Sequence, residues 1–99
     1  MTTSPKKLMT IVAEAGLENR VLKMLLDSGA RGYTVSIAHG DGPREGRASD
    51  INGGNIRIES VVSSEVADVI LSKLEKDYFP HYAVTCWMSD VQVVREDRY

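Results

Sequence analysis

The residues best suited to bind a ligand lie in a glycine-rich segment near the middle of this 99-residue chain. Arg44 and Arg47 are three positions apart, and Gly40 and Gly42 precede them. A guanidinium group carries a permanent charge and a planar fork of N–H donors that matches a phosphate group. Glycines allow the backbone to approach such a ligand closely, because they have no Cβ. This pattern predicts phosphate binding, although a charged hairpin tip that only faces solvent has a similar composition.

The length of this segment also favours a function. It runs from Gly40 to Gly54, about fifteen residues, and contains five of the eight glycines. Most connections in compact domains have about four to six residues, and much longer ones are usually functional or disordered. Known phosphate-binding loops fit poorly, because the third glycine of a dinucleotide fingerprint is displaced to Gly46 and the Gly-Lys-Ser/Thr of a Walker loop is missing. We therefore expect a flexible arm that binds phosphate without either of these known motifs.

Other reactive residues do not form a recognisable site. His39 and His81 are the two histidines, and neither belongs to a cluster with metal-ligand spacing, so we expect no metal. No Ser-His-Asp or Cys-His arrangement can be argued from spacing, so we expect a binding protein with no catalytic residues rather than an enzyme. Cys86 is the single cysteine, and we expect it to be a small buried side chain within a strand.

Composition narrows the class of protein. The chain is 42% hydrophobic and 26% charged, which predicts a single globular domain over residues 1–99. Its net charge of −2 gives little support to nucleic-acid binding, which normally needs a basic surface. No apolar run approaches the roughly twenty residues of a membrane span, and no signal peptide is evident. We therefore expect a cytoplasmic protein.

The hydrophobic pattern predicts four strands and two helices. Strands are expected at 8–13, 33–38, 55–62 and 83–94, and helices at 17–27 and from about 63 to 77. Gly29 is placed to end the first helix, and Ser63-Ser64-Glu65 can start the second, with a serine as its cap. The buried stripes predicted for the helices are Leu17, Val21, Met24 and Leu25 in the first, and Val66, Val69, Ile70 and Leu74 in the second. The order β-α-β-β-α-β predicts an α+β, ferredoxin-like fold.

The first predicted strand is apolar on both faces. Leu8 and Val12 lie on one face, and Met9 and Ile11 on the other. Two helices can cover only one face of the sheet, whereas an open antiparallel sheet normally presents polar side chains to water. Self-association would bury the second face, so we expect a homo-oligomer whose sheets face inward.

Four stretches of the sequence together carry a family resemblance. They are Asp27-Ser28-Gly29-Ala30-Arg31-Gly32-Tyr33-Thr34-Val35, Gly40-x-Gly42-x-Arg44-x-x-Arg47, Asn55-Ile56-x-x-Glu59 and Tyr78-Phe79-x-x-Tyr82-Ala83. With these stretches the chain resembles the PII-like proteins of inorganic-carbon metabolism. That family includes the bicarbonate-transporter-associated group of cyanobacteria and the carboxysome-associated group of chemoautotrophic bacteria.

The resemblance implies a fold, a ligand and a role. It implies a homotrimer that binds an adenine nucleotide in the clefts between subunits: ADP or AMP, with ATP and cyclic AMP as further candidates, together with bicarbonate. The long loop corresponds to the T-loop, a flexible arm that meets a protein partner such as a bicarbonate transporter or a carboxysome component. The implied role is a non-enzymatic sensor that regulates inorganic-carbon uptake or carboxysome function in a carbon-concentrating mechanism.

The resemblance also assigns roles within the site. It implies that the two loop arginines contact phosphate, that the glycines at the loop base let the backbone approach the ligand, and that the adenosine end meets the second strand and the start of the last strand. The residues concerned are Arg44, Arg47, Gly40, Gly42, Thr34, Ser36, Tyr82, Ala83 and Val84.

Some features of the wider family are missing from this chain. No tyrosine lies between Gly40 and Gly54, so uridylylation is not expected. The lysine-bearing turn before the last strand, on which 2-oxoglutarate sensing depends in the nitrogen-control proteins, is also missing. The chain ends at Tyr99 without the cysteine-bearing extension that is common in the cyanobacterial group. These differences favour the carboxysome-associated group.

Three other classes of function remain open from the sequence. A small phosphohydrolase on the same fold would need a general base, for which Asp41 and Glu45 are the available residues. An RNA-recognition domain would need aromatic side chains on its third strand, and residues 55–60 contain none. A structural trimer of the metal-tolerance type would bind no nucleotide.

Overall fold

The computed structural model describes residues 2–40 and 54–99. In these residues the strands and helices follow one another in the predicted order, β-α-β-β-α-β. The bounds of the elements are β1 (Ser4–Glu14), α1 (Glu18–Asp27), β2 (Thr34–Ala38), β3 (Asn55–Val62), α2 (Ser64–Lys73) and β4 (Thr85–Val93). A 3₁₀ turn at Ala15–Leu17 precedes α1, a π-helical turn at Leu74–Tyr78 extends α2, and a 3₁₀ turn at Glu96–Arg98 follows β4. Gly42, Arg44 and Arg47 lie outside the described residues.

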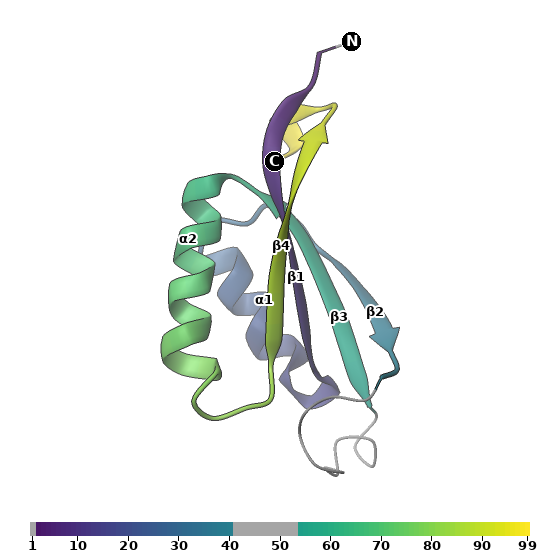
Figure 1. Ribbon diagram of the computed structural model, residues 1–99, viewed down its shortest axis with the longest axis vertical. Helices are drawn as coiled ribbons and strands as arrows, with labels where there is room; N and C mark the ends of the chain where they lie inside the picture. The colour runs from purple at the N-terminus through teal and green to yellow at the C-terminus, as the bar shows by residue number, and fades with distance from the viewer. Residues whose placement is uncertain (1, 41–53) are drawn as a thin grey trace.

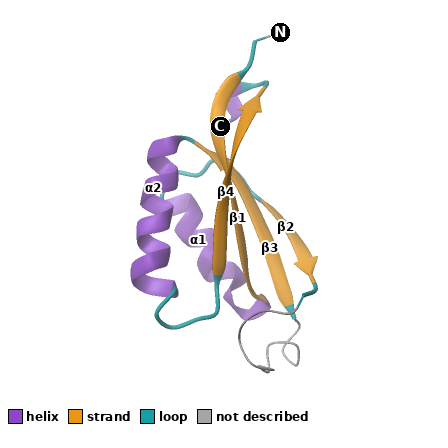
Figure 2. Ribbon diagram, in the orientation of Figure 1, coloured by secondary structure: helices purple, strands orange, loops and turns teal. Residues whose placement is uncertain are grey.

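The four strands form one antiparallel sheet in the order β2-β3-β1-β4. Both α-helices lie on the same face of this sheet, as Figures 1 and 2 show. The arrangement is the ferredoxin-like α+β fold that the element order predicts. We call the side opposite the two helices the open face.

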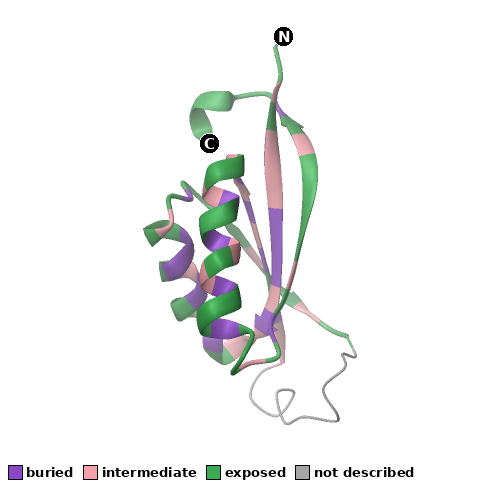
Figure 3. Ribbon diagram, turned by 60° about the vertical axis from the view of Figure 1, so that its left-hand side comes forward, coloured by how far each residue is buried: buried purple, intermediate pink, exposed green. Residues whose placement is uncertain are grey.

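The core lies between the helices and one face of the sheet. Met9, Ile11 and Ala13 of β1 are almost completely buried there, beside Ile58 of β3. Residues of one strand alternate between the two faces, so Leu8 and Val12 lie on the open face, where both are only partly buried. The buried stripes in Figure 3 follow the inner sides of both helices. The prediction that β1 is apolar on both faces is therefore confirmed.

Both predicted helix ends are confirmed by hydrogen bonds. At the end of α1, the Gly29 N–H donates to the Leu26 carbonyl (3.1 Å) and the Ala30 N–H to the Leu25 carbonyl (3.0 Å). These are the two bonds of a Schellman motif, and Gly29 has the positive φ of +111° that the motif requires. At the start of α2, the Ser63 hydroxyl accepts a hydrogen bond from the Val66 N–H (3.2 Å).

The structure corrects three details of the sequence-based elements. Val69 is 42% exposed, and Ala67 takes its expected place in the core. The reason is geometric: residues two positions apart in the sequence are rotated by about 200° around the helix axis. Val69 therefore faces away from the side of the helix on which Ala67 lies. β1 begins at Ser4 because its first residues pair with the end of β4. β4 begins only at Thr85, so residues 83 and 84 form part of the connection that precedes the strand.

Candidate functional site

The base of the long loop and the connection from α2 to β4 lie at the same end of the sheet. Ala38 pairs with Asn55, and Asn55 pairs with Glu14 at the end of β1. Thr85, the first residue of β4, pairs with Val12 close to that end. Figure 1 shows the end of β2, the start of β3 and the α2–β4 connection together at this end of the molecule. The fold therefore brings both predicted ligand-binding segments to one end.

Thr34 and Ser36 lie on β2, an edge strand, and their side chains share the open face. Thr34 pairs with Glu59 and Ser36 with Arg57 on β3. The Arg57 Nη2 lies 3.2 Å from the Glu59 Oε2, so a charged pair flanks the two hydroxyl groups. Both predicted residues are exposed and remain accessible to a ligand or to a second copy of the chain.

Residues 82–84 lie beside the opposite edge of the sheet. They precede β4, which pairs only with β1 in the sheet order. Tyr82 is half-buried, Ala83 is exposed, and the Val84 side chain is buried in the core, which leaves its backbone as the group open to a ligand. Three strand spacings separate β2 from β4, which is about 14 Å. Within a single chain, residues 82–84 therefore lie far from both Thr34 and Ser36.

The loop base is held by a residue that the sequence did not single out as part of the site. The Gly54 carbonyl accepts a hydrogen bond from the Ala15 N–H (2.9 Å), which ties the start of β3 to the end of β1. Gly54 has a φ of +74°, a conformation that side chains rarely adopt. Gly40, at the other side of the base, is exposed, and a Cβ there would meet nothing within 4 Å.

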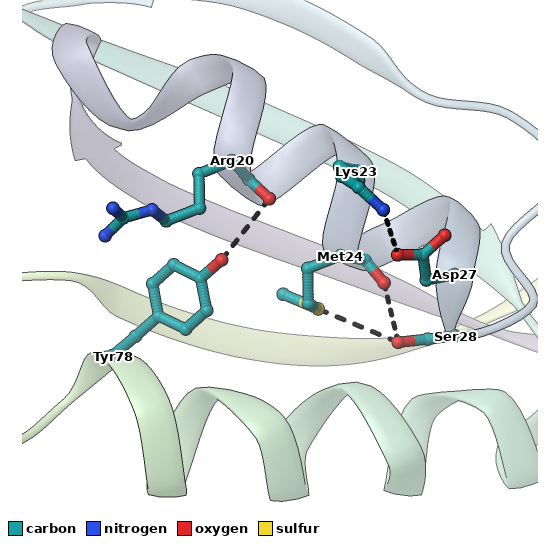
Figure 4. Close-up of polar contacts among 6 residues, drawn as sticks. All are labelled: Arg20, Lys23, Met24, Asp27, Ser28 and Tyr78. Carbon is teal, nitrogen blue, oxygen red and sulfur yellow. Dashed lines mark hydrogen bonds and ion pairs between the residues drawn. The ribbon is translucent and has the colours of Figure 1, made fainter.

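A second residue that sequence reasoning missed is Arg20 on α1. Its Nη1 donates to the Tyr82 hydroxyl (2.5 Å), and its carbonyl accepts a hydrogen bond from the Tyr78 hydroxyl (3.3 Å), the contact drawn in Figure 4. Burial raises the pKa of the Tyr78 hydroxyl above its ordinary value, and the Arg20 charge opposes that shift. Arg20 and Tyr82 are 62 positions apart, so no local pattern signals their contact.

The open face is hollowed at the end away from the loop base. The hollow has a volume of about 990 Å³ and lies between the sheet and the C-terminal tail. Thr34 and Glu59 line it, together with Arg31, Arg95 and Arg98. Ser36 and residues 82–84 are not among its lining residues. Of the predicted site residues that the structure describes, Thr34 is thus the one that borders this hollow.

The remaining sequence-based expectations concern metals, membranes and the cysteine. Within residues 2–40 and 54–99, no group of three or more His, Cys, Asp or Glu side chains could hold a metal ion. Across the same ranges, no helix is long and apolar enough to cross a membrane. Cys86 is half-buried on β4 against the core, where desolvation raises the pKa of its thiol from 9.0 to about 11.

Comparison with known proteins identifies similar sequences and folds. The model of the family described as nitrogen regulatory protein P-II matches residues 6–98. A protein of Thermus thermophilus, described as a PII-like signaling protein, is 46% identical, with 100% of this chain and 99% of that chain covered and a TM-score of 0.86. CPII from Thiomonas intermedia K12, solved with ADP and bicarbonate, is 23% identical, with 98% and 96% covered and a TM-score of 0.85.

Proposed function

Because the chain belongs to the nitrogen regulatory protein P-II family, we propose that it is a non-enzymatic regulator that binds adenine nucleotides between the subunits of a cytoplasmic homotrimer. The nucleotide is ADP or AMP, with ATP and cyclic AMP as further candidates, and bicarbonate binds with it. The protein signals through the loop between β2 and β3 to a partner in inorganic-carbon uptake or in the carboxysome.

The observation that carries this proposal is the separation of the two halves of the candidate site. Thr34 and Ser36 belong to one edge strand, and residues 82–84 precede the strand at the other edge. We propose that copies of the chain assemble around a threefold axis with the β2 edge of one copy next to the β4 edge of its neighbour. A ligand between two copies would then contact both halves at once. Oligomers of this kind use the same pair of surfaces at every interface.

The apolar open face supports assembly. Leu8, Val12, Val61 and Val91 are partly buried there, and Trp87 is 48% exposed. Apolar side chains gathered on one exposed face of a small protein often mark an interface. Assembly with the open faces turned inward would bury these side chains and leave the helices outside.

The choice of ligand is supported by two independent features. CPII, which has the same fold, is described in complex with ADP and bicarbonate, and in another structure with ADP, AMP and bicarbonate. The charged groups of this chain suit the phosphates of the same ligand, because the loop sequence holds two guanidinium forks, Arg44 and Arg47, three positions apart. An adenine nucleotide can present its phosphate groups to those forks, while the faces of its base offer apolar surface to other residues of the site.

The binding free energy of the nucleotide limits how much of the loop the nucleotide can order. Ordering a loop of about fifteen residues from a fully flexible state would cost roughly 15–30 kcal/mol of backbone entropy. A ligand of micromolar affinity supplies about 8 kcal/mol in total. The nucleotide therefore fixes the part of the loop near its base and selects among loop conformations, which a protein partner then recognises.

Isothermal titration calorimetry tests the proposal directly. ADP, AMP, ATP and cyclic AMP are each titrated into the intact protein, with and without bicarbonate, while light scattering records the molar mass. We expect at least one adenine nucleotide to bind at one site per chain in a trimer. A phosphohydrolase would instead release phosphate with turnover, and a structural trimer would bind none of the four nucleotides.

A further inference from the structure

The connection between α2 and β4 is held by side-chain contacts rather than by strand pairing. Residues 79–84 belong to no helix or strand, and the pairing of β4 with β1 starts only at Thr85. Inside the connection, the N–H groups of His81 (3.0 Å) and Tyr82 (2.9 Å) both donate to the Tyr78 carbonyl. These two bonds close the turn on itself, while the Val84 side chain is buried in the core and the Tyr82 side chain packs against it.

Arg20 attaches both ends of this turn to α1. Its carbonyl accepts the Tyr78 hydroxyl hydrogen bond (3.3 Å), at the start of the turn, as Figure 4 shows. Its side chain reaches the other end, where Nη1 donates to the Tyr82 hydroxyl (2.5 Å) and Cζ lies 5.6 Å from the centre of the Tyr82 ring. The two tyrosine rings are 6.2 Å apart, so one residue of α1 holds a compact aromatic pair.

The two contacts of Arg20 differ in what a substitution would remove. The contact with Tyr78 uses the backbone carbonyl and remains whatever side chain stands at position 20. Tyr78 is also 5% exposed and belongs to the core, which holds it independently. The contact with Tyr82 uses the guanidinium, and Tyr82 is only half-buried. A substitution of Arg20 would therefore remove the polar contacts of Tyr82 and loosen that end of the turn, while the Tyr78 end stays in place.

We propose that Arg20 is a positioning residue of the nucleotide site, which holds Tyr82 and the adjoining backbone of residues 83–84 in the orientation that receives the adenosine end of the ligand. This inference rests on the proposed function. Arg20 acts through Tyr82 and does not itself contact phosphate. A guanidinium suits this role because it is charged at all relevant pH values and holds several donors in one plane.

The test compares two ligands that differ only in charge. Arg20→Met keeps the length of an unbranched side chain but removes the hydrogen bond to Tyr82. Calorimetry on the intact protein should show that affinity falls by about tenfold, the effect of one hydrogen bond to a charged group. The loss should be equal for adenosine and for ADP, because the adenosine end is the part affected. A loss confined to ADP would mean that Arg20 binds phosphate and would overturn the inference.

A control variant separates positioning from a general effect of charge. Lys23 lies on the same helix, and its Nζ is paired with the Asp27 Oδ2 at 2.8 Å (Figure 4). Lys23→Met removes the same charge but no contact with the turn, so both affinities should stay within twofold of the unmodified protein. An equal loss in Lys23→Met and Arg20→Met would contradict the positioning role.

A double-mutant cycle tests whether Arg20 acts through Tyr82. Tyr82→Phe keeps the ring and removes the hydroxyl that accepts the Arg20 hydrogen bond. In the Tyr82→Phe background, Arg20→Met should lower adenosine affinity by clearly less than tenfold, because the hydrogen bond is already lost and only the contact of the guanidinium with the ring remains. A full tenfold loss in both backgrounds would contradict the inference.

Amide hydrogen exchange gives a readout without ligand. The amides of residues 83 and 84 should exchange faster in Arg20→Met than in the unmodified protein. Unchanged exchange rates would also contradict the inference.

The outcome also distinguishes this inference from the proposed function. If the unmodified protein binds no adenine nucleotide, the proposed function fails. If it binds nucleotide and Arg20→Met binds equally well, only the positioning role fails. Arg20→Lys keeps the charge and is the variant to use if Arg20→Met does not fold; it should show a smaller loss, again equal for adenosine and ADP.

Discussion

Arg44 and Arg47 are expected to recognise the phosphate end of the nucleotide, in contrast to Arg20. Each charge-assisted hydrogen bond to phosphate contributes about 1.5–3 kcal/mol. Replacement of either arginine by alanine should therefore weaken ADP binding by about tenfold or more, but adenosine binding by less than twofold. Calorimetric titration with both ligands measures the difference. Equal losses for the two ligands would show that these arginines do not contact phosphate.

The Cys86 thiol is expected to be unusually unreactive. Desolvation raises the pKa of this thiol from 9.0 to about 11, because its half-buried position on β4 disfavours the thiolate. Only the thiolate reacts with alkylating reagents. The rate of iodoacetamide labelling should therefore rise steeply with pH between about 9 and 11 in the folded protein, whereas the protein in urea should already approach its plateau above pH 9.

The same pKa shift has a consequence for stability. Between pH 9 and about 11 the folded state holds the Cys86 proton that the unfolded state has lost. The free energy of unfolding must then fall as the pH rises through this window, since stability decreases wherever the folded state binds more protons. Cys86→Ala should make this part of the pH dependence smaller. A labelling rate that reaches its plateau at pH 9 in the folded protein would contradict both expectations.

At the scale of single elements, the end of α1 depends on one glycine. Gly29 has a φ of +111°, and a Cβ built there would lie 3.1 Å from the Val66 Cγ2 on α2. Gly29→Ala should lower the free energy of unfolding by about 1–3 kcal/mol, because it combines backbone strain with a close contact. Urea denaturation measures the change.

Gly16→Ala is the matched control for this substitution. Gly16 lies in the 3₁₀ turn before α1, and a Cβ there would meet nothing within 4 Å. Its replacement should leave the free energy of unfolding unchanged or raise it by up to about 1 kcal/mol, because alanine restricts the unfolded chain. If both variants lost the same amount of stability, the special role of Gly29 would be wrong.

The helix ends and the alternation of β1 could be predicted because they depend on neighbouring residues. Gly29 and Ser63 act within one turn of their own helix, and the two faces of β1 follow from a period of two. Val69 was placed wrongly because valine is apolar wherever it stands, and only the packing of α2 against the sheet decides which side is covered. A hydrophobic pattern thus predicts that α2 is a helix but not which of its apolar residues are buried.

Sequence reasoning proposed a set of site residues but could not give their arrangement. Thr34 and residues 82–84 were chosen from their resemblance to known proteins, and their roles stay predictions. That they lie at opposite edges of one sheet follows from the strand order, which brings together residues far apart in the sequence. The contact of Arg20 with Tyr82 depends on the packing of α1 against the turn after α2, so no motif could reveal it.

At the scale of the whole molecule, assembly and ligand binding should depend on each other. If the nucleotide lies between the β2 edge of one copy and the β4 edge of its neighbour, a dissociated chain offers only half a site. A ligand that binds the assembled form alone also stabilises that form by mass action. Nucleotide should therefore raise the melting temperature and keep the protein assembled on dilution.

A single substitution on the open face tests this coupling. Trp87 pairs with Thr10 of β1 and lies on the open face, where its side chain is 48% exposed. Trp87→Arg would place a charge where the proposed assembly excludes water, which is costly because a buried charge needs a partner. We expect light scattering to show single chains and calorimetry to show loss of nucleotide binding, while the circular dichroism of the fold is kept.

The control substitution for the open face lies on the opposite side of the molecule. Val69 is 42% exposed on the outer side of α2, away from the open face. Val69→Arg adds the same charge, but the protein should remain a trimer and bind nucleotide as before. If Trp87→Arg still assembled and bound nucleotide like Val69→Arg, the open face would not be the interface. A different arrangement of the subunits would then be needed to bring the β2 edge and the β4 edge to one ligand.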